Sequence, residues 1–253
     1  MLGERPELAR YLVRRGCKTD LLMAAALGDI ALAKKHLDAD PNSIRIRVSD
    51  EYFPMVGGKT GGTIYQWKLG WYVEAHQVAR KYGREHILQL LVDRSWDPVK
   101  VIDAILMSVE AAARALLSQK PRIADEFTAE DRRQAAHAAR NNDTAAVRLF
   151  LECGLPVDGT SQHQGTPLHW AAFHGNLDMT HIILGCSPPL ETKDRDFDGT
   201  PLNWAIHGSE HGWSRETGDY AGTVEALIQA GAKPPDSISG SPAVQDVLRR
   251  LAP

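Results

Sequence analysis

Cysteine is scarce in this 253-residue sequence, where Cys17, Cys153 and Cys186 are far apart and odd in number. Such a set does not form the disulfide framework of a small secreted domain, and it predicts free, mostly packed thiols in a reducing compartment. No apolar run approaches the roughly 18 residues of a membrane span, and the first residues lack the apolar core of a signal peptide. We therefore expect a cytoplasmic protein with no membrane contact.

Excess charge and catalytic motifs are also lacking. The net charge of −3 argues against nucleic acid as a partner. No serine or cysteine lies in a nucleophile motif, and no carboxylate pair is marked as an acid–base couple. The run 57–60 (G-G-K-T) resembles a phosphate loop, but Phe53 stands where that motif needs its first glycine. We expect a flexible connection there and no cofactor.

The sequence does contain a repeat. The run 165–172 (G-T-P-L-H-W-A-A) returns as G-T-P-L-N-W-A from Gly199, 34 residues after Gly165. Thr166 suits the cap before a helix, Pro167 suits the first helical position, and Gly175 suits the left-handed residue that ends the helix. A second helix is predicted over Leu177–Leu184. Because two short helices cannot bury their apolar faces alone, such units stack around one shared core.

These residues resemble the ankyrin repeat, whose signature is a T-P-L-H-x-A run in a unit of about 33 residues. The resemblance implies an all-α solenoid, an ankyrin-like stack of helix-turn-helix repeats. It also implies that His169 hydrogen-bonds to backbone between repeats, whereas Asn203 replaces that histidine in the next unit. Finally, it implies a non-enzymatic protein–protein interaction module, which we expect to be a monomer.

The repeat pattern extends along much of the chain. The turns near Val109, Asn142 and Gly175 are each 33 residues apart, and Asn142 is predicted to adopt the left-handed conformation that glycine adopts elsewhere. The start within a repeat leads us to expect a longer reading frame. We predict the second helix of a truncated repeat at 1–18, a repeat at 19–40, an insertion at 41–73, two degenerate repeats at 74–121, three repeats at 122–235, and a linker with a capping helix at 236–253.

The insertion at 41–73 is predicted to be β-hairpin-like. Ile44, Ile46 and Val48 alternate with polar residues, as does the run 63–69, and a two-residue period favours strands. The insertion holds six of the chain's 17 aromatic residues. We expect Tyr52 and Phe53 to pack on the solenoid. We expect a partner to contact the other candidates, which are Tyr65, Trp67 and Trp71.

A second insertion is predicted near 209–219. The resemblance places partner contacts at hairpin tips and on first-helix surfaces, and segment 191–219 holds three Lys or Arg against seven Asp or Glu, which favours a basic partner. Trp170 and Trp204 occupy equivalent positions and are interpreted as core packing rather than ligand contacts. The partner-binding candidates in this half are His163, Phe173, His174, Arg195, Phe197, His207 and Trp213.

Two alternatives remain open. The run 207–211 matches H-x-x-E-H, so His207, Glu210 and His211 could serve a zinc-dependent hydrolase if both histidines lay on one helical face. We expect Gly208 and Gly212 to break any helix there, which favours a histidine-rich loop. The other alternative is that the chain is the targeting part of a longer enzyme.

Overall fold

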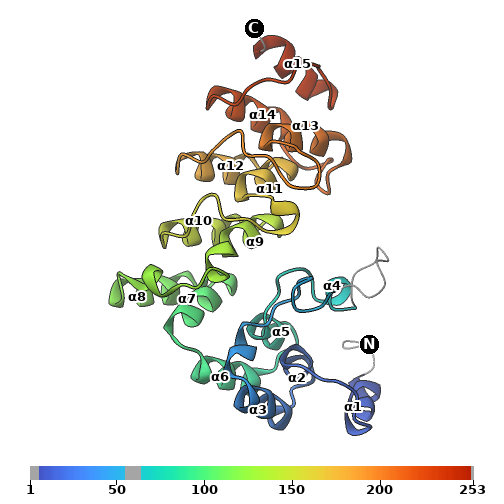
Figure 1. The fold of residues 1–253 in the computed structure, drawn as a ribbon, viewed down its shortest axis with the longest axis vertical. Coiled ribbons are helices and arrows are strands. Elements are labelled where there is room, and N and C mark those ends of the chain that lie inside the picture. The colour runs from blue at the N-terminus through green and yellow to red at the C-terminus, as the bar shows by residue number, and fades with distance from the viewer. Residues whose placement is uncertain (1–5, 55–63, 252–253) are drawn as a thin grey trace. The chain divides into compact units, whose positions relative to one another are not determined.

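The computed structural model describes residues 6–54 and 64–251 of the chain (Figure 1). Its described part is helical and contains no β-strand, as expected for an all-α repeat solenoid. None of these helices is both long enough and apolar enough to cross a bilayer. The chain separates into two compact units, residues 1–107 and residues 108–253.

The first unit is built from paired helices. Helix α2 contacts α5, α3 contacts α6, and α5 also contacts α7, so equivalent helices of successive pairs lie against each other. Asp20 and Asp29 cap α2 and α3 by accepting hydrogen bonds from backbone N–H groups, and Gly28 links the two helices at a φ of +70°. The helices are α1 (Pro6–Arg14), α2 (Leu21–Leu27), α3 (Ile30–Ala39), α4 (Ile64–Lys68), α5 (Ala75–Lys81), α6 (Glu85–Arg94) and α7 (Asp97–Leu106).

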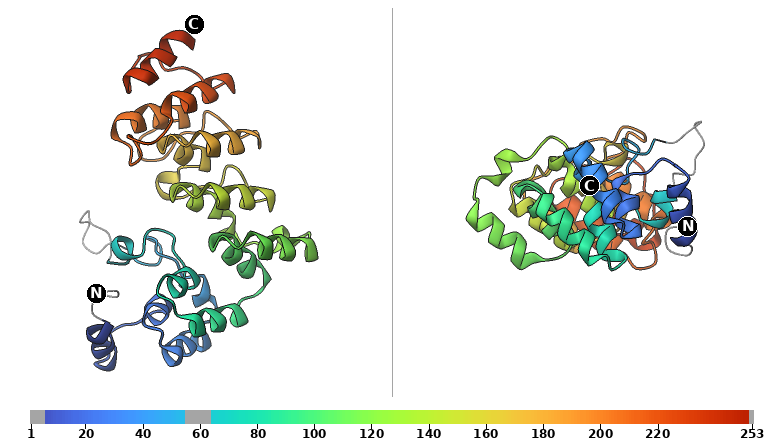
Figure 2. Two further views of the ribbon diagram at one scale, coloured as in Figure 1. Left: turned by 180° about the vertical axis from the view of Figure 1, so that it is seen from behind. Right: turned by 90° about the horizontal axis from the view of Figure 1, so that it is seen from below.

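The second unit forms a regular stack, which Figure 2 shows from behind. First helices pack in the order α9, α11, α13, second helices pack in the order α10, α12, α14, and α15 covers α14. Small buried residues such as Ala171 and Ala172 allow this close approach. The helices are α8 (Glu110–Gln119), α9 (Gln134–Arg140), α10 (Thr144–Glu152), α11 (Pro167–Phe173), α12 (Leu177–Leu184), α13 (Pro201–His211), α14 (Tyr220–Gln229) and α15 (Pro242–Leu251).

The predicted helix signals of the central repeat are confirmed. Thr166 caps α11 by accepting the backbone N–H of His169, and Pro167 is the first helical residue. Gly175 and Asn142 have φ values of +59° each, so both occupy the left-handed region that the sequence predicts for them.

The predicted strands of the first insertion are wrong. Pro41–Arg45 forms a 3₁₀ helix that Asp40 caps, and α4 occupies part of the second expected strand. Val48 instead exchanges backbone hydrogen bonds with the segment 72–73. The alternation of apolar and polar residues did not indicate a half-exposed strand, because one of the polar residues, Arg47, is buried and pairs with Glu74 at 3.5 Å. The glycine-rich run 57–62 lies outside the described residues.

Gly208 does not break the helix before the second insertion, so that expectation is wrong. Helix α13 continues through it to His211, and Gly212 is the residue that caps the helix. A Cβ atom on Gly208 would lie 2.6 Å from the carbonyl oxygen of Phe173. Glycine therefore allows α13 to pack against the backbone at the end of α11, and the helix tolerates it at modest cost.

Candidate partner-binding pocket

Two tryptophans at equivalent repeat positions form the floor of a pocket in the second unit. Trp170 of α11 and Trp204 of α13 are buried, and their rings meet edge to face with centroids 4.9 Å apart. The Trp170 Nε1–H donates to Ser161 Oγ at 2.7 Å, and the Trp204 Nε1–H donates to Asp194 Oδ2 at 2.9 Å. Both indole N–H groups are therefore satisfied within the protein, and the rings offer the pocket their carbon surfaces.

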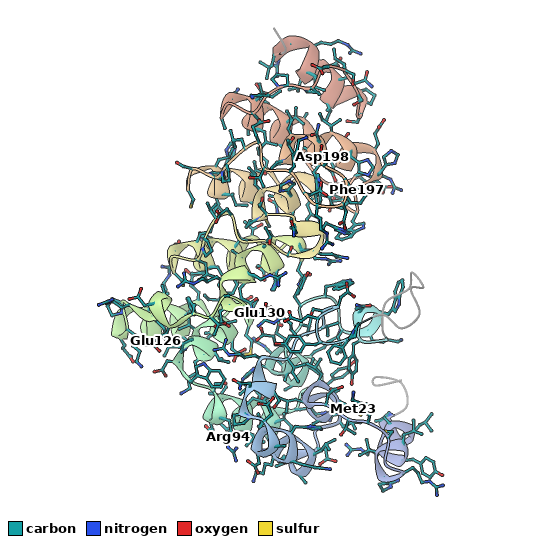
Figure 3. All side chains as sticks on the ribbon, viewed as in Figure 1. Met23, Arg94, Glu126, Glu130, Phe197 and Asp198 are labelled. Carbon is teal, nitrogen blue, oxygen red and sulfur yellow. The ribbon has the colours of Figure 1, made fainter. Side chains whose placement is uncertain are left out.

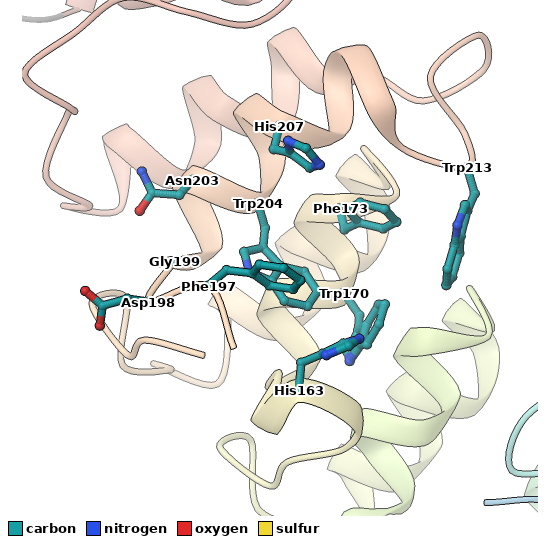
Figure 4. Close-up of a pocket in the computed structure, with 10 residues that line it drawn as sticks. All are labelled: His163, Trp170, Phe173, Phe197, Asp198, Gly199, Asn203, Trp204, His207 and Trp213. Carbon is teal, nitrogen blue, oxygen red and sulfur yellow. The ribbon is translucent and has the colours of Figure 1, made fainter. Parts of the chain in front are cut away.

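The pocket has a volume of about 480 Å³ and is lined mainly by aromatic rings (Figure 4). That volume is in the range of sites that hold a small molecule or a protruding side chain. Figure 4 shows the side chains of Asp198 and Asn203 pointing away from the rings. The lining residues are His163, Trp170, Phe173, Phe197, Asp198, Gly199, Asn203, Trp204, His207 and Trp213.

Two exposed rings flank the pocket. Phe197, at the outer surface before α13, is 69% exposed (Figure 3). Trp213, just after α13, is 61% exposed, yet its ring lies 5.2 Å from that of Phe173 and 5.9 Å from that of Trp170. Phe197 is on the loop before α13 and Trp213 is on the loop after it, so the pocket combines a buried floor with an accessible rim.

Asp194 organises the loop that carries Phe197. Its carboxylate accepts the backbone N–H groups of Asp196, Phe197 and Gly199, as well as the Trp204 indole N–H. Burial alone raises the pKa of Asp194, but these hydrogen bonds lower the pKa below its ordinary value. The group is therefore ionised at neutral pH and lies at the N–H edge of the Trp204 ring.

A second carboxylate lies beside His163. The Nδ1 atom of His163 is 2.6 Å from Asp196 Oδ2, and Arg195 Nε donates to the other oxygen at 2.7 Å. Hydrogen bonds from Arg195 and then His163 lower the pKa of Asp196 to about 2. His163 has a φ of +61°, and its carbonyl accepts the Arg195 N–H at 2.8 Å, so the two loops are joined.

A cation of the chain itself already lies on two of these rings. The Arg140 guanidinium is 5.4 Å from the Trp170 ring centroid and 5.0 Å from that of Trp213. Arg140 Nε also donates to Gln162 Oε1 at 3.0 Å, which fixes the guanidinium in place. At these distances the ring quadrupole attracts a cation.

The structure brings five of the predicted residues together at the pocket: His163, Phe173, Phe197, His207 and Trp213. Arg195 joins them indirectly through Asp196. His174 does not, because it is buried and its Nε2 lies 2.9 Å from the Arg140 carbonyl oxygen. Burial lowers the pKa of His174, so it is neutral and donates that hydrogen bond between repeats. His174 does not line this pocket, and its contact with a partner stays a prediction.

The first-insertion candidates have different environments. Tyr65 is buried, and its hydroxyl donates to Asp20 Oδ2 at 2.8 Å, so this ring supports the helix pair rather than an exposed surface. Phe53 packs edge-on against Tyr65 at 4.9 Å, as its predicted self-packing requires. Trp67 is 75% exposed, and Trp71 is half-buried beside Tyr72. Partner contact by Trp67 and Trp71 stays a prediction.

The H-x-x-E-H motif lies at the end of α13. The rings of His207 and His211 are 4.8 Å apart because α13 continues through Gly208, which places them one turn apart. Within the residues that the structure describes, however, this pair and Glu210 do not form a set of three donors close enough to share an ion. Among the described residues, no third His, Cys, Asp or Glu donor lies close enough to this pair to complete a catalytic zinc site.

A cluster of three potential metal-binding residues lies in the first unit instead. Donor atoms of Glu74, His76 and Asp103 lie within 4.8 Å of one another, and all three residues are buried. His76 Nε2 is 2.9 Å from Asp103 Oδ2, and Arg47 is 3.5 Å from Glu74. With a protonated His76 the two carboxylates face two cations, so the cluster also forms an internal ion-pair network.

Sequence reasoning missed the role of Trp170 and Trp204 as pocket floor. Their recurrence at one repeat position was visible and was interpreted as core packing, which their burial agrees with. Asp194 and Arg140 were missed altogether, because nothing in their local sequence indicates that they support aromatic rings from neighbouring repeats.

Comparison with known proteins places the repeats in a family. A family profile described as ankyrin repeats in three copies matches residues 75–196 and residues 136–236. The chain is 40% identical over 74 residues to an E3 ubiquitin-protein ligase, XB3, of Oryza sativa subsp. japonica. It is 35% identical over 75 residues to alpha-latrotoxin-Lt1a of Latrodectus tredecimguttatus.

These relatives are much longer proteins. The matched region is 29% of this chain in both cases, but 16% of the rice ligase and 5% of the latrotoxin. The similarity therefore concerns a limited region of each relative. The profile matches together run from residue 75 to residue 236, more than half of the sequence, and α9–α14 have the expected helix-pair stacking. The chain belongs to the ankyrin repeat family.

Proposed function

We propose that this chain binds a partner protein through the aromatic pocket between α11 and α13. The single observation that carries this proposal is the exposure of Phe197 and Trp213 beside a cavity of about 480 Å³. Large aromatic residues dominate the binding energy of protein interfaces, and they do so where a well-packed pocket excludes water. A monomeric protein gains no stability from leaving such rings in solvent.

The arrangement of the pocket favours a protruding side chain over a flat surface. Its floor is fixed by the Trp170–Trp204 contact and by hydrogen bonds from both indoles. Little reorganisation is then needed on binding, which reduces the entropic cost of association. Ankyrin repeats are protein-interaction modules, and this pocket lies at the loops and first helices that the family resemblance indicates.

The charge near the pocket supports a basic partner. Asp194 and Asp196 are ionised, and segment 191–219 holds seven acidic residues against three Lys or Arg. Complementary charge steers the encounter and selects among partners more than it adds affinity.

The proposal is tested by affinity capture with the purified chain as bait, compared with a Phe197→Ala/Trp213→Ala variant, and quantified by mass spectrometry. We expect a partner that the unmodified chain retains and the variant loses. Trp67→Ala is the matched control, because it removes another exposed tryptophan, one that lies in the first unit. Circular dichroism must show that all variants fold. A partner that survives the pocket variant and is lost with Trp67→Ala would transfer the binding site to the first insertion.

A further inference from the structure

The lining of the pocket selects a particular kind of side chain. The Trp170, Phe173, Trp204 and Trp213 rings lie within 4.9–6.1 Å of one another in several pairs, so the cavity wall is largely π-surface. An aromatic face carries negative charge density, whereas its edge is positive, and tryptophan gives the strongest attraction for a cation. Such a wall accepts a cation or an apolar group and disfavours an anion.

One feature favours a cation over a neutral apolar group. The ionised Asp194 accepts the Trp204 indole N–H at 2.9 Å, which polarises that ring and adds a negative charge at its N–H edge. The Arg140 guanidinium lies 5.0 Å from Trp213 and 5.4 Å from Trp170, and because it has the same charge as the ligand it directs a second cation toward Trp204 and Asp194. Arg140 is not among the pocket-lining residues, and it leaves the cavity open.

The pocket offers few hydrogen-bond acceptors to such a cation. Asp198 pairs with Lys193 at 2.5 Å, and Asn203 Oδ1 accepts the Thr200 N–H at 3.0 Å. Both side chains point away from the rings in Figure 4. A lysine ammonium carries three N–H donors that would lose their water. An ammonium whose hydrogens are replaced by methyl groups has no such need and presents a larger apolar surface.

We propose that the occupant is a methylated lysine side chain of the partner protein, held by its quaternary or tertiary ammonium against the Trp204 ring, with its methyl groups in the cavity that Trp170 and Trp213 also line. The proposal rests on the proposed function, since it names the side chain that enters the same pocket. Aromatic cages bind alkylated ammonium groups by cation–π attraction.

The test uses the six tryptophans as reporters. The chain is labelled with ¹⁵N-tryptophan, and each indole N–H signal is assigned through a single Trp→Phe variant. The first probe is N-acetyl-trimethyllysine amide. The second is its neutral isostere with carbon in place of the ammonium nitrogen, and the third is N-acetyl-lysine amide. We expect trimethyllysine to shift the signals of Trp170, Trp204 and Trp213, and to leave those of Trp67, Trp71 and Trp96 unchanged.

The isostere should bind about five- to thirtyfold more weakly, which is the contribution of a cation–π contact in a partly desolvated site. Trp213→Leu should abolish the shifts at Trp170 and Trp204, whereas Trp67→Leu should leave them intact. Equal binding of the isostere, or of unmodified lysine, overturns the methylated-lysine inference but leaves the pocket as a docking site. Choline binding as tightly as trimethyllysine would instead assign the pocket to a free small molecule.

If none of the probes shifts any indole signal, the inference is overturned. The proposed function is judged separately, because partner capture with the Phe197→Ala/Trp213→Ala variant does not depend on which side chain the partner inserts.

Discussion

The Nε2 atom of His169 lies 3.1 Å from the carbonyl oxygen of Gly199, 30 residues later in the sequence. The Nδ1 atom of the same ring accepts the backbone N–H of Thr166 at 3.2 Å, so Nδ1 carries no proton and Nε2–H is the donor. Burial lowers the pKa of His169 and keeps the ring in this neutral form. One side chain thereby caps its own helix and joins it to the next repeat.

Replacing His169 with alanine should destabilise the second unit by about 2–4 kcal/mol, because the buried Thr166 N–H loses its acceptor and the Gly199 carbonyl keeps only the Asp194 N–H. His169→Asn is the matched variant, since Asn203 shows that asparagine can complete this cap by accepting the Thr200 N–H. We expect it to cost roughly half as much, because asparagine is too short to reach Gly199. Urea unfolding measures the free energy of unfolding of both variants. If both lost the same amount, the hydrogen bond from His169 to the Gly199 carbonyl would make no separate contribution to stability.

Gly208→Ala should also destabilise the second unit. The added Cβ would lie 2.6 Å from the Phe173 carbonyl oxygen and 2.9 Å from the Tyr220 ring, so α13 must move away from α11. Overpacking of this kind costs about 1–3 kcal/mol, which exceeds the gain in helix propensity. Glu210→Ala, an exposed change on the same helix, is the control and should remain within about 0.5 kcal/mol. Thermal unfolding that is unchanged by Gly208→Ala would show that the two helices are not in close contact.

Arg47 and Glu74 should behave as a coupled pair in the first unit. Arg47→Met leaves the Glu74 carboxylate buried without this cation and should cost about 3–5 kcal/mol. The double variant Arg47→Met/Glu74→Gln should recover part of that loss, because the uncompensated charge is gone. Arg94→Met, which breaks an exposed pair with Asp38, is expected to cost less than about 1 kcal/mol. Denaturant unfolding measures the free energy of unfolding of Arg47→Met, Glu74→Gln and the double variant. If the losses of the two single variants add up to the loss of the double variant, the coupling is refuted.

The two units should respond to pH in opposite directions. Burial opposes the charged form of His76, but Asp103 and then Glu74 raise its pKa above 6.5 overall. A raised pKa stabilises the first unit at low pH, and this stabilisation is lost as pH rises through the folded-state value. His169 and His174 have pKa values lowered by burial, so the second unit loses stability as pH falls below 6.5.

Hydrogen exchange between about pH 5.5 and about pH 8.5, corrected for the intrinsic rate, measures this contrast unit by unit. His76→Gln should flatten the response of the first unit and leave that of the second unit unchanged. If both units lost protection together at low pH, the charge of His76 would not contribute as described.

The repeat core was predictable because its signals are local. Thr166, Pro167 and Gly175 each lie at a position where one conformation is favoured, and α12 has the bounds that its pattern predicts. The segment after Asp40 was not predictable in this way, because burial of Arg47 depends on Glu74, which is distant in sequence. Likewise, Gly208 is a helix breaker by local propensity, but its contact with the Phe173 backbone determines its role.

The candidate pocket was predicted only in part. Phe197 and Trp213 were identified because the resemblance places contacts at tips and insertions, and both are exposed. Their convergence on Trp170 and Trp204 depends on how consecutive repeats stack, which a periodic pattern does not specify. The burial of Tyr65 and His174 was missed because each has a hydrogen-bond partner in another helix pair or repeat.

The walls of the pocket come from two consecutive repeats, with Trp170 on one and Trp204 and Trp213 on the next. Stacked repeats are stabilised by nearest-neighbour interfaces, so each junction can open without the whole unit unfolding. A ligand that contacts both walls binds only the closed junction and therefore favours it by mass action. Partner affinity and the persistence of this junction are thus linked, and a substitution that loosens the α11–α13 contact would weaken binding without touching the ligand.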